Sequence, residues 1–284
     1  MRSVPLSGTE KQSVYFEIAA SRTPARTTEV IRSGRPRNDR KNMSQKNRTL
    51  KILEAAIQEF INEGEPVSSK QIAEKYKFGV KDATIRSELN ALTESGFLNQ
   101  PHTSGGRIPT DKGYQFLANR VMQDVLDSMD SFHQHFNRMI NLMGSNGFEN
   151  FVSRVSQETK LLSAGFSNKD NEAYKMGLDE LFDQLEINSR EDFCQVAKDF
   201  EMLDERMENL PRIIEKSDSP QIFIGKKSPI TQSEHLSVII DSYDINGNKY
   251  YLALIGPKRM DYGKNVKYLK NIKNQKAKVK KISN

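Results

Sequence analysis

Cysteine, histidine and long apolar runs are scarce in this 284-residue chain. The single cysteine, Cys194, excludes an intramolecular disulfide and a cysteine-rich zinc site, and its position among apolar helical residues predicts a core residue. The spacing of the four histidines predicts no ligand cluster, so neither a metal site nor a cofactor is expected. No apolar run reaches membrane-spanning length, and the signal-peptide pattern is absent. We therefore expect a protein of the reducing cytoplasm with no membrane partner.

Signatures of catalysis are also absent. The chain contains no phosphate-binding loop, dinucleotide fingerprint, zinc-protease helix or nucleophile elbow. Lys258, Arg259 and Asp261 cluster near the carboxyl end, but structural roles explain them better. Gly256 and Pro257 can end a strand, Asp261 can cap the next helix, and Arg259 can pair with a nearby acid. We expect no catalytic residue and no enzyme.

Charge of either sign is unevenly distributed along the chain. Residues 1–42 carry 9 basic and 4 acidic side chains, whereas residues 43–113 carry 10 and 9. Residues 114–263 carry 16 and 24, and residues 264–284 carry 8 and none. Basic ends can attract a polyanion. The near-neutral segment 43–113 must instead gain any DNA affinity from arranged contacts and dimerisation. The composition of residues 1–42 is typical of a disordered segment. We interpret these residues as an optional extension, because Met43 is a natural start.

The central feature of the sequence is the stretch 78–113. Its first part predicts a helix with Asp82 as N-cap, an apolar stripe at Ile85, Leu89 and Leu92, and an end at Gly96. The opposite face carries short polar side chains and one arginine, without an acid: Ala83, Thr84, Arg86, Ser87 and Asn90. Such a face suits a DNA major groove. An ordinary solvated helix face is the alternative.

The neighbouring segments favour a DNA-binding unit. Residues 49–63 predict a helix, Ser68 or Ser69 can cap a short second helix, and Phe78-Gly79-Val80 turns into the third. Residues 98–101 and 107–109 predict two strands around a flexible tip at Ser104-Gly105-Gly106. Three helices and a hairpin describe a winged helix-turn-helix. Its candidate DNA contacts are Lys81, Thr84, Arg86, Ser87, Asn90, His102, Thr103, Ser104 and Arg107. Winged helices also dock proteins, so a protein-interaction module without a DNA role remains an alternative.

The rest of the chain predicts helices followed by strands. A long helix runs from Thr110 or Asp111 to about residue 143, with a heptad pattern at Met122, Val125, Met129, Phe132, Phe136, Met139 and Met143. This seam could pair two protomers or pack within its own domain. Further helices are expected at 151–162, 171–185 and 189–216, the last with a buried stripe beginning at Phe193, and residues 163–171 form a loop. Three strands follow, two of them joined by a hairpin at Asn246-Gly247, and then a helix at 261–272.

Several motifs resemble one known family. EPVSSKQIAEKY, DATIRSEL and QPHTSGGRIPTDKGY in the first part, and QIFIG and IGPKRMDY near the end, are similar to the heat-inducible transcription repressor HrcA family. The resemblance implies a dimeric repressor that binds an inverted-repeat operator of double-stranded DNA upstream of chaperone operons. It also implies that the chaperonin GroEL keeps the repressor active and that heat stress releases the genes. The strand-rich end would belong to a GAF-like sensory domain.

Taken together, the sequence predicts an α+β protein of five segments. These are a disordered basic extension (1–42), a winged-helix DNA-binding domain (43–113), a linker or dimerisation helix (114–143), a shortened GAF-like regulatory domain (144–263) and a helix end with a lysine-rich tail (264–284). The GAF-like part lacks about a hundred residues of typical family members, so its sheet is expected to be incomplete. A regulator that senses a small-molecule ligand through this domain is a further alternative.

Overall fold

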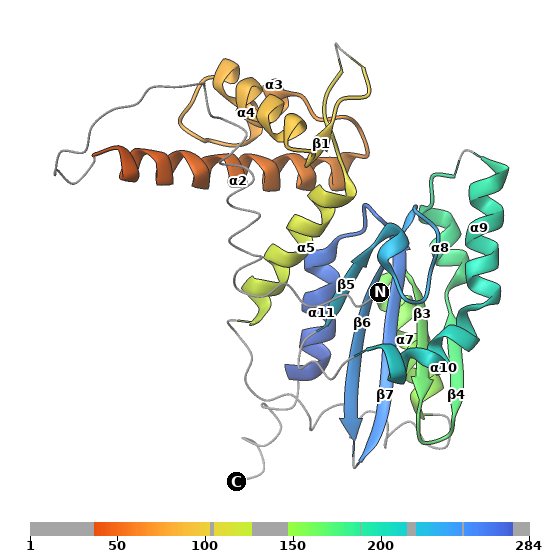
Figure 1. The fold of residues 1–284 in the computed structure, drawn as a ribbon. Coiled ribbons are helices and arrows are strands. Elements are labelled where there is room, and N and C mark those ends of the chain that lie inside the picture. Colours follow the sequence, from red (N-terminus) through yellow and green to blue (C-terminus); the bar gives the residue numbers. More distant parts are fainter. Residues whose placement is uncertain are drawn as a thin grey trace, which may run out of the picture. The chain divides into compact units, whose positions relative to one another are not determined.

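The computed structural model describes residues 37–102, 105–126, 147–187, 189–214, 220–245 and 247–274. It divides into two compact units, residues 1–113 and 114–284 (Figure 1). Helices and strands occur in both units, and the fold is of the α+β class. No helix among the described residues is both long and apolar enough to cross a membrane.

The described part of the first unit contains three helices and a small hairpin. Its elements are α2 (Arg37–Glu63), α3 (Ser69–Lys75), α4 (Asp82–Glu94), β1 (Leu98–Asn99) and β2 (Ile108–Pro109). Of the two serines predicted as possible caps, Ser68 caps α3, and it does so through a capping box with Gln71. Gly96 follows α4 with φ +73°, which favours glycine at this helix end. The core is built from aliphatic side chains of all three helices, including Ile52, Leu53, Ile57, Ile72, Ile85, Leu89 and Leu92.

Two boundaries in this unit differ from the sequence-based expectation. Lys81, not Asp82, occupies the N-cap position of α4, and no side chain caps this helix end. Asp82 lies in the first turn, where its negative charge still suits the helix dipole. Helix α2 begins at Arg37. The prediction that the whole of residues 1–42 is disordered is therefore wrong for residues 37–42, while residues 1–36 lie outside the described part of the chain.

The hairpin is tied to the linker between α2 and α3. Strands β1 and β2 pair antiparallel. The backbone of Arg107 exchanges hydrogen bonds of 2.8 and 2.9 Å with that of Val67. This close approach explains Gly106, because a Cβ at this position would lie 2.4 Å from the carbonyl carbon and oxygen of Pro66. Three segments of the unit thus form one small β-layer around the arginine predicted to contact DNA.

The second unit is built on a five-stranded antiparallel sheet of order β4-β3-β7-β6-β5. The strands are β3 (Leu162–Ser167), β4 (Glu172–Met176), β5 (Gln221–Ile224), β6 (Leu236–Ile245) and β7 (Asn248–Pro257). Strands β6 and β7 form a long hairpin that pairs Leu236 with Pro257 at one end and Ile245 with Asn248 at the other. Gly247 in the turn has φ +82°. The predicted hairpin is therefore confirmed.

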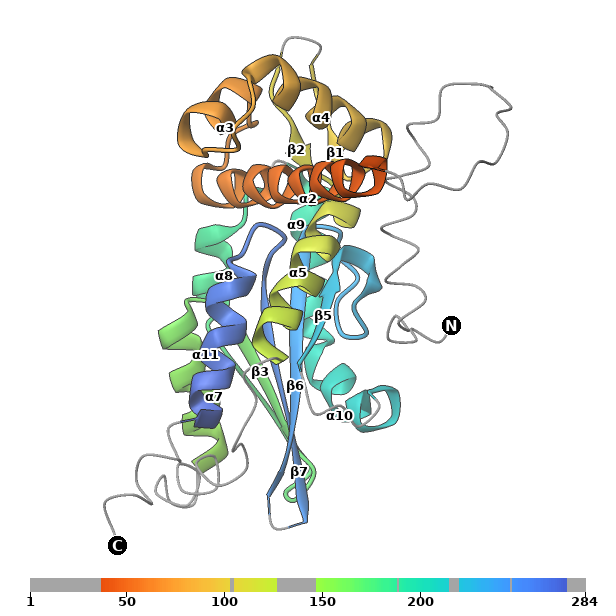
Figure 2. The same ribbon diagram turned by 90° about the vertical axis from the view of Figure 1, so that its left-hand side faces the viewer.

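Helices cover both faces of this sheet (Figure 2). Helix α7 (Gly147–Thr159) packs on β3, where Phe148 and Val152 lie over Gly165. Helix α11 (Tyr262–Asn274) lies on the same face, since its Tyr262 donates a hydrogen bond to Ser237 of β6. The opposite face is covered by α8 (Leu178–Gln184), α9 (Arg190–Glu201) and α10 (Leu203–Ile213). Helix α5 (Asp111–Leu126) begins at the boundary between the two units, and η2 (Gly225–Lys227) follows β5. The second unit thus has three layers.

The sequence-based expectation missed two strands. Residues 163–171 and the start of the helix expected at 171–185 instead form the hairpin β3–β4, and only α8 is helical in that region. The helix expected at 189–216 is two helices, α9 and α10, which meet at Met202. The sheet was expected to be incomplete because the chain lacks about a hundred residues of typical family members. The described sheet nevertheless has five strands, two of which were taken for loop and helix.

Two side chains of α9 also lie differently from the expectation. Phe193 was placed in the buried stripe, but half of its surface is exposed, whereas Val196, Leu203, Met207 and Leu210 are buried. Cys194 is exposed and is not a core residue. Of the predicted heptad seam, Met122 and Val125 belong to α5, and its other five positions lie outside the described residues.

Candidate nucleic-acid interface

Helix α4 presents a polar face on the side away from its buried stripe. Arg86, Ser87 and Asn90 are exposed on this face, and Thr84 is half-buried at its margin. Lys81, also exposed, precedes the helix. Arg86 lies 3.5 Å from Asp82, one turn earlier, in a pair that solvent reaches on both sides. An exposed ion pair of this kind contributes little to stability, so Arg86 can leave Asp82 and bind another anion.

The loop of the hairpin brings a second arginine to the same face. The guanidinium of Arg107 donates a hydrogen bond to the side-chain oxygen of Asn90, although the two residues are 17 positions apart. Burial lowers the pKa of Arg107, and the positive charge of Arg86 nearby lowers it further. Two arginines and an amide therefore share one region of the surface, with Ser87 on the same helix face.

The other candidates on the hairpin are less well placed by the structure. His102 is exposed in the loop three residues after the end of β1, and its carbonyl accepts a hydrogen bond of 2.8 Å from the Gly105 amide. Thr103 and Ser104 lie outside the described residues. Gln100 reaches across the loop and donates to the Gly105 carbonyl at 3.3 Å. The loop is thus braced from within by backbone and amide contacts.

A buried acid, which sequence reasoning missed, fixes the rear of α4. Glu88 has 1% exposure and accepts a hydrogen bond from Arg48 of α2 at 2.9 Å and another from the Thr49 hydroxyl. The signal in the sequence is an acid within the apolar stripe, which requires a buried partner. This contact orients α4 on α2, and with it the polar face on the other side of the helix.

A second polar cluster joins α2 to α3. The carboxylate of Glu59 accepts from Lys75 at 2.6 Å and from the Tyr76 hydroxyl at 2.7 Å. Burial opposes the charge of Glu59, but these hydrogen bonds outweigh it and lower the pKa of this carboxyl. Burial, together with the hydrogen bond to Glu59, raises the pKa of Tyr76 to about 12. All three helices are therefore held by charged contacts as well as by the apolar core.

The cluster near the carboxyl end has structural roles, as expected. Arg259 pairs with Glu186 at 2.6 Å, and the Asp261 carboxylate caps α11 by accepting from the Lys264 amide at 2.8 Å.

A family model described as "HrcA protein C terminal domain" matches residues 114–266. The match begins where the second unit begins and covers more than half of the chain. Together the matches and the fold define an α+β protein whose named relatives are transcription repressors. The chain belongs to the HrcA family.

Individual relatives match shorter segments. A heat-inducible transcription repressor HrcA from Clostridium acetobutylicum is 51% identical over 81 residues, which is 28% of this chain and 24% of that protein. A protein of the same name from Frankia casuarinae is 49% identical over 74 residues, 26% of this chain and 22% of that one. Each match thus spans about a quarter of the relative's length. A crystal structure described only as that of a hypothetical protein has a TM-score of 0.63 at 16% identity, covers 80% of this chain and 96% of that one, and supports the fold alone.

Proposed function

We propose that this protein represses transcription of heat-shock chaperone operons by binding an inverted-repeat operator as a homodimer. The first unit acts as a winged helix-turn-helix, with α4 as the recognition helix and the β1–β2 hairpin as the wing. The second unit acts as a shortened GAF-like regulatory domain. The observation that carries the proposal is the polar face of α4, where Arg86, Ser87 and Asn90 are exposed and Arg107 joins them from the hairpin.

The side chains divide between base readout and backbone anchoring. Arg86 can reach a guanine edge and Asn90 an adenine edge, the pairings that these side chains favour in a major groove. Lys81, Thr84 and Ser87 would contact the phosphates beside the inserted helix. His102, Thr103, Ser104 and Arg107 contact the backbone or the minor groove beside it. Because residues 43–113 are close to neutral, affinity comes from these contacts and from the pairing of two protomers on two half-sites.

We infer that the repressor is regulated in the way that its resemblance to the HrcA family implies. The chaperonin GroEL keeps the repressor in its active fold in the cytoplasm, and heat stress draws the chaperonin away so that the operator is released. A fold that is lost under mild stress fits a regulator whose switching element is among the least stable parts of the chain.

The experiment is a binding titration of the full chain on an inverted-repeat fragment of a chaperone promoter against a scrambled fragment. Salt is held constant, and GroEL is present or absent. We expect selective binding that GroEL strengthens. Arg86→Ala should weaken operator binding by about 10- to 100-fold, the value of one bidentate base contact, and leave the scrambled fragment much less affected.

A matched control uses an equivalent arginine of the second unit. Arg154 on α7 is exposed and pairs with an acid one turn away, as Arg86 does. Arg154→Ala should bind the operator like the wild type. If Arg86→Ala also binds like the wild type, the first unit is a protein-docking module. Equal, salt-sensitive binding to both fragments would mean that basic tails alone hold DNA, and the operator proposal would be wrong.

A further inference from the structure

Three potential metal ligands meet at the amino end of α9, in the second unit. Asp192, Glu234 and His235 each offer one ligand atom, and these atoms lie within 4.8 Å of one another. Asp192 lies in the first turn of α9, while Glu234 and His235 immediately precede β6. The group therefore joins a helix to the loop that leads into the sheet. It is independent of the proposed DNA interface, which lies in the first unit.

The carboxylate of Asp192 is oriented by the helix cap. The Ser189 hydroxyl donates to Oδ2 of Asp192 at 2.7 Å and accepts from the Asp192 amide at 3.0 Å. This leaves Oδ1 directed at Nε2 of His235, at 3.1 Å. Nε2 is buried, and apart from this ion pair with Asp192 no hydrogen-bond partner is found for it among the described residues. A ligand nitrogen and a ligand oxygen thus already face each other, in a contact that a metal ion between them would replace.

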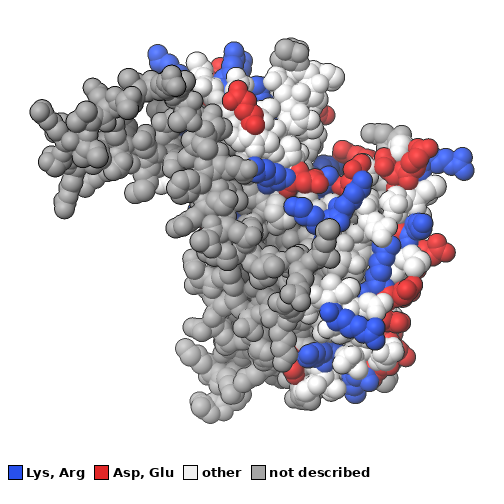
Figure 3. All heavy atoms as spheres, viewed as in Figure 1, with Lys and Arg blue, Asp and Glu red and all other residues white. Residues whose placement is uncertain are grey.

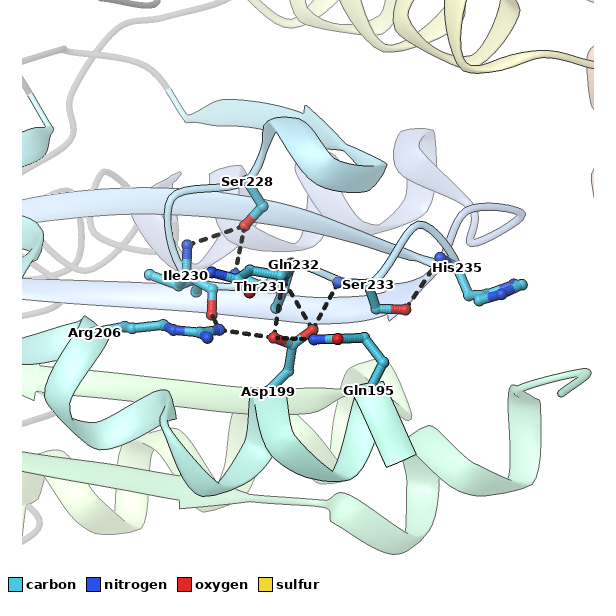
Figure 4. A network of polar contacts seen from close by, with 9 residues as sticks. All are labelled: Gln195, Asp199, Arg206, Ser228, Ile230, Thr231, Gln232, Ser233 and His235. Carbon is cyan, nitrogen blue, oxygen red and sulfur yellow. Dashed lines mark hydrogen bonds and ion pairs between the residues drawn. The ribbon is translucent and has the colours of Figure 1, made fainter. Parts of the chain in front are cut away.

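The loop that carries His235 is held from below by a buried acid (Figure 4). Asp199 of α9, with 2% exposure, accepts from the backbone amides of Gln232 at 2.9 Å and Ser233 at 2.8 Å. The Ser233 hydroxyl in turn accepts from the His235 amide at 3.2 Å. Both sides of the cluster are therefore positioned by contacts outside it, which is the support that metal ligands require.

We propose that Asp192, Glu234 and His235 form a site for Zn²⁺ or a similar transition-metal ion, with water completing a four-coordinate shell. One imidazole and two carboxylates are ligands that zinc accepts, whereas Ca²⁺ and Mg²⁺ prefer oxygen alone. Two ligands bound about 2 Å from one ion at a tetrahedral angle are about 3.3 Å apart. The 3.1 Å between Nε2 and Oδ1 is close to this separation.

Glu234 requires a small rearrangement to complete the site. It lies 3.4 Å from Lys226, and both side chains are more than half exposed. An exposed pair of this kind contributes little, so a divalent ion can displace the lysine. In Figure 3 acidic and basic side chains alternate along the side of the second unit where α9 lies, so no large field of positive charge opposes a cation there. When bound, the ion links α9 to the loop before β6.

The test is calorimetric titration of the full-length, tag-free protein with ZnCl₂, alongside MgCl₂ and CaCl₂. We expect one zinc ion per chain and no response to magnesium or calcium. His235→Gln and Glu234→Gln should each weaken zinc binding at least about tenfold. The visible absorption of added Co²⁺ should show the intense bands of a four-coordinate site, and His235→Gln should remove them. Unchanged near-ultraviolet circular dichroism shows that the variants remain folded.

Two matched controls test other zinc ligands on the surface. His102→Gln removes an exposed histidine of the first unit, and Cys194→Ser removes the exposed thiol two residues from Asp192. Both should bind zinc within about twofold of the wild type. The proposal is refuted if the wild type binds no zinc, if His235→Gln binds as tightly as the wild type, or if either control abolishes binding.

Discussion

Replacing Asp199 by asparagine should destabilise the second unit strongly, although the change is isosteric. The Asp199 carboxylate lies 2.7 Å from the Arg206 guanidinium and accepts from the amides of Gln232 and Ser233. An asparagine side chain has the same shape as aspartate but no charge. Its amide NH₂ group is a donor and would face the donors that Asp199 accepts from. Breaking one side of a buried pair costs about 3–5 kcal/mol. Because Arg206 is 18% exposed, we expect the lower end, about 3 kcal/mol of unfolding free energy.

Tyrosine provides a probe for this unit. The chain has no tryptophan, and seven of its nine tyrosines lie in the second unit. Urea unfolding followed by near-ultraviolet circular dichroism of tyrosine therefore reports chiefly on the sheet and its helices. The control is Asp204→Asn on α10, since Asp204 pairs with Lys175 at 2.8 Å but is 48% exposed. This exposed pair should contribute less than about 1 kcal/mol.

Equal stability of the two variants would contradict the reasoning, because it would mean that the buried network contributes no more than a surface pair. A double variant sharpens the result. Arg206→Met alone leaves the Asp199 charge buried, and combining it with Asp199→Asn removes both charges. The double variant should therefore lose less stability than the two single changes together.

Three further predictions concern single positions. Gly106→Ala places a Cβ 2.4 Å from the Pro66 carbonyl group, so it should destabilise the first unit by about 1–3 kcal/mol and weaken operator binding, as measured by thermal unfolding and by titration. Because Cys194 is exposed, its thiol should react with Ellman's reagent in the native protein as fast as in urea. A slow reaction in the native protein would show that the thiol is buried. Because the pKa of Glu59 is lowered in the folded state, its contribution to stability is present above the unfolded value and is lost as pH falls through the folded value. Stability of the first unit should therefore fall on acidification below about pH 4.5, and Glu59→Gln, which also loses the charge that faces Lys75, should show a smaller fall.

Local patterns in the sequence were sufficient wherever burial follows a simple period. The helices α3 and α4, the β6–β7 hairpin and the cap at Asp261 were all predicted from propensity, stripe or turn residues. The hairpin β3–β4 was not. Strand β3 has the sequence LSAGFS, whose small residues resemble a loop, yet every one of its residues is buried. Glycine is needed there because a Cβ at Gly165 would lie 2.5 Å from Val152 of α7.

Strand β4 was not predicted from the sequence for the opposite reason. Its sequence, EAYKM, consists largely of helix-forming residues, and pairing with β3 overrides that preference. Such pairing depends on the packing of the whole sheet, so the residues near β4 in the sequence do not by themselves indicate that it is a strand. Phe193 and Cys194 also depart from the helical period, since Val196 of the predicted stripe is buried whereas Phe193, three residues earlier, is half exposed and Cys194 is exposed.

The candidate interface shows the same division between local and distant information. The exposed residues of α4 follow from one helical period, and the sequence predicted them as a group. Their arrangement depends on contacts that no period encodes, since Arg107 reaches Asn90 from the hairpin and Glu88 is held by Arg48 on α2. In the proposed complex with DNA, these contacts decide whether Asn90 acts alone or together with an arginine. A residue list taken from the sequence therefore identifies which side chains can bind, whereas the tertiary contacts determine which of them act as one unit.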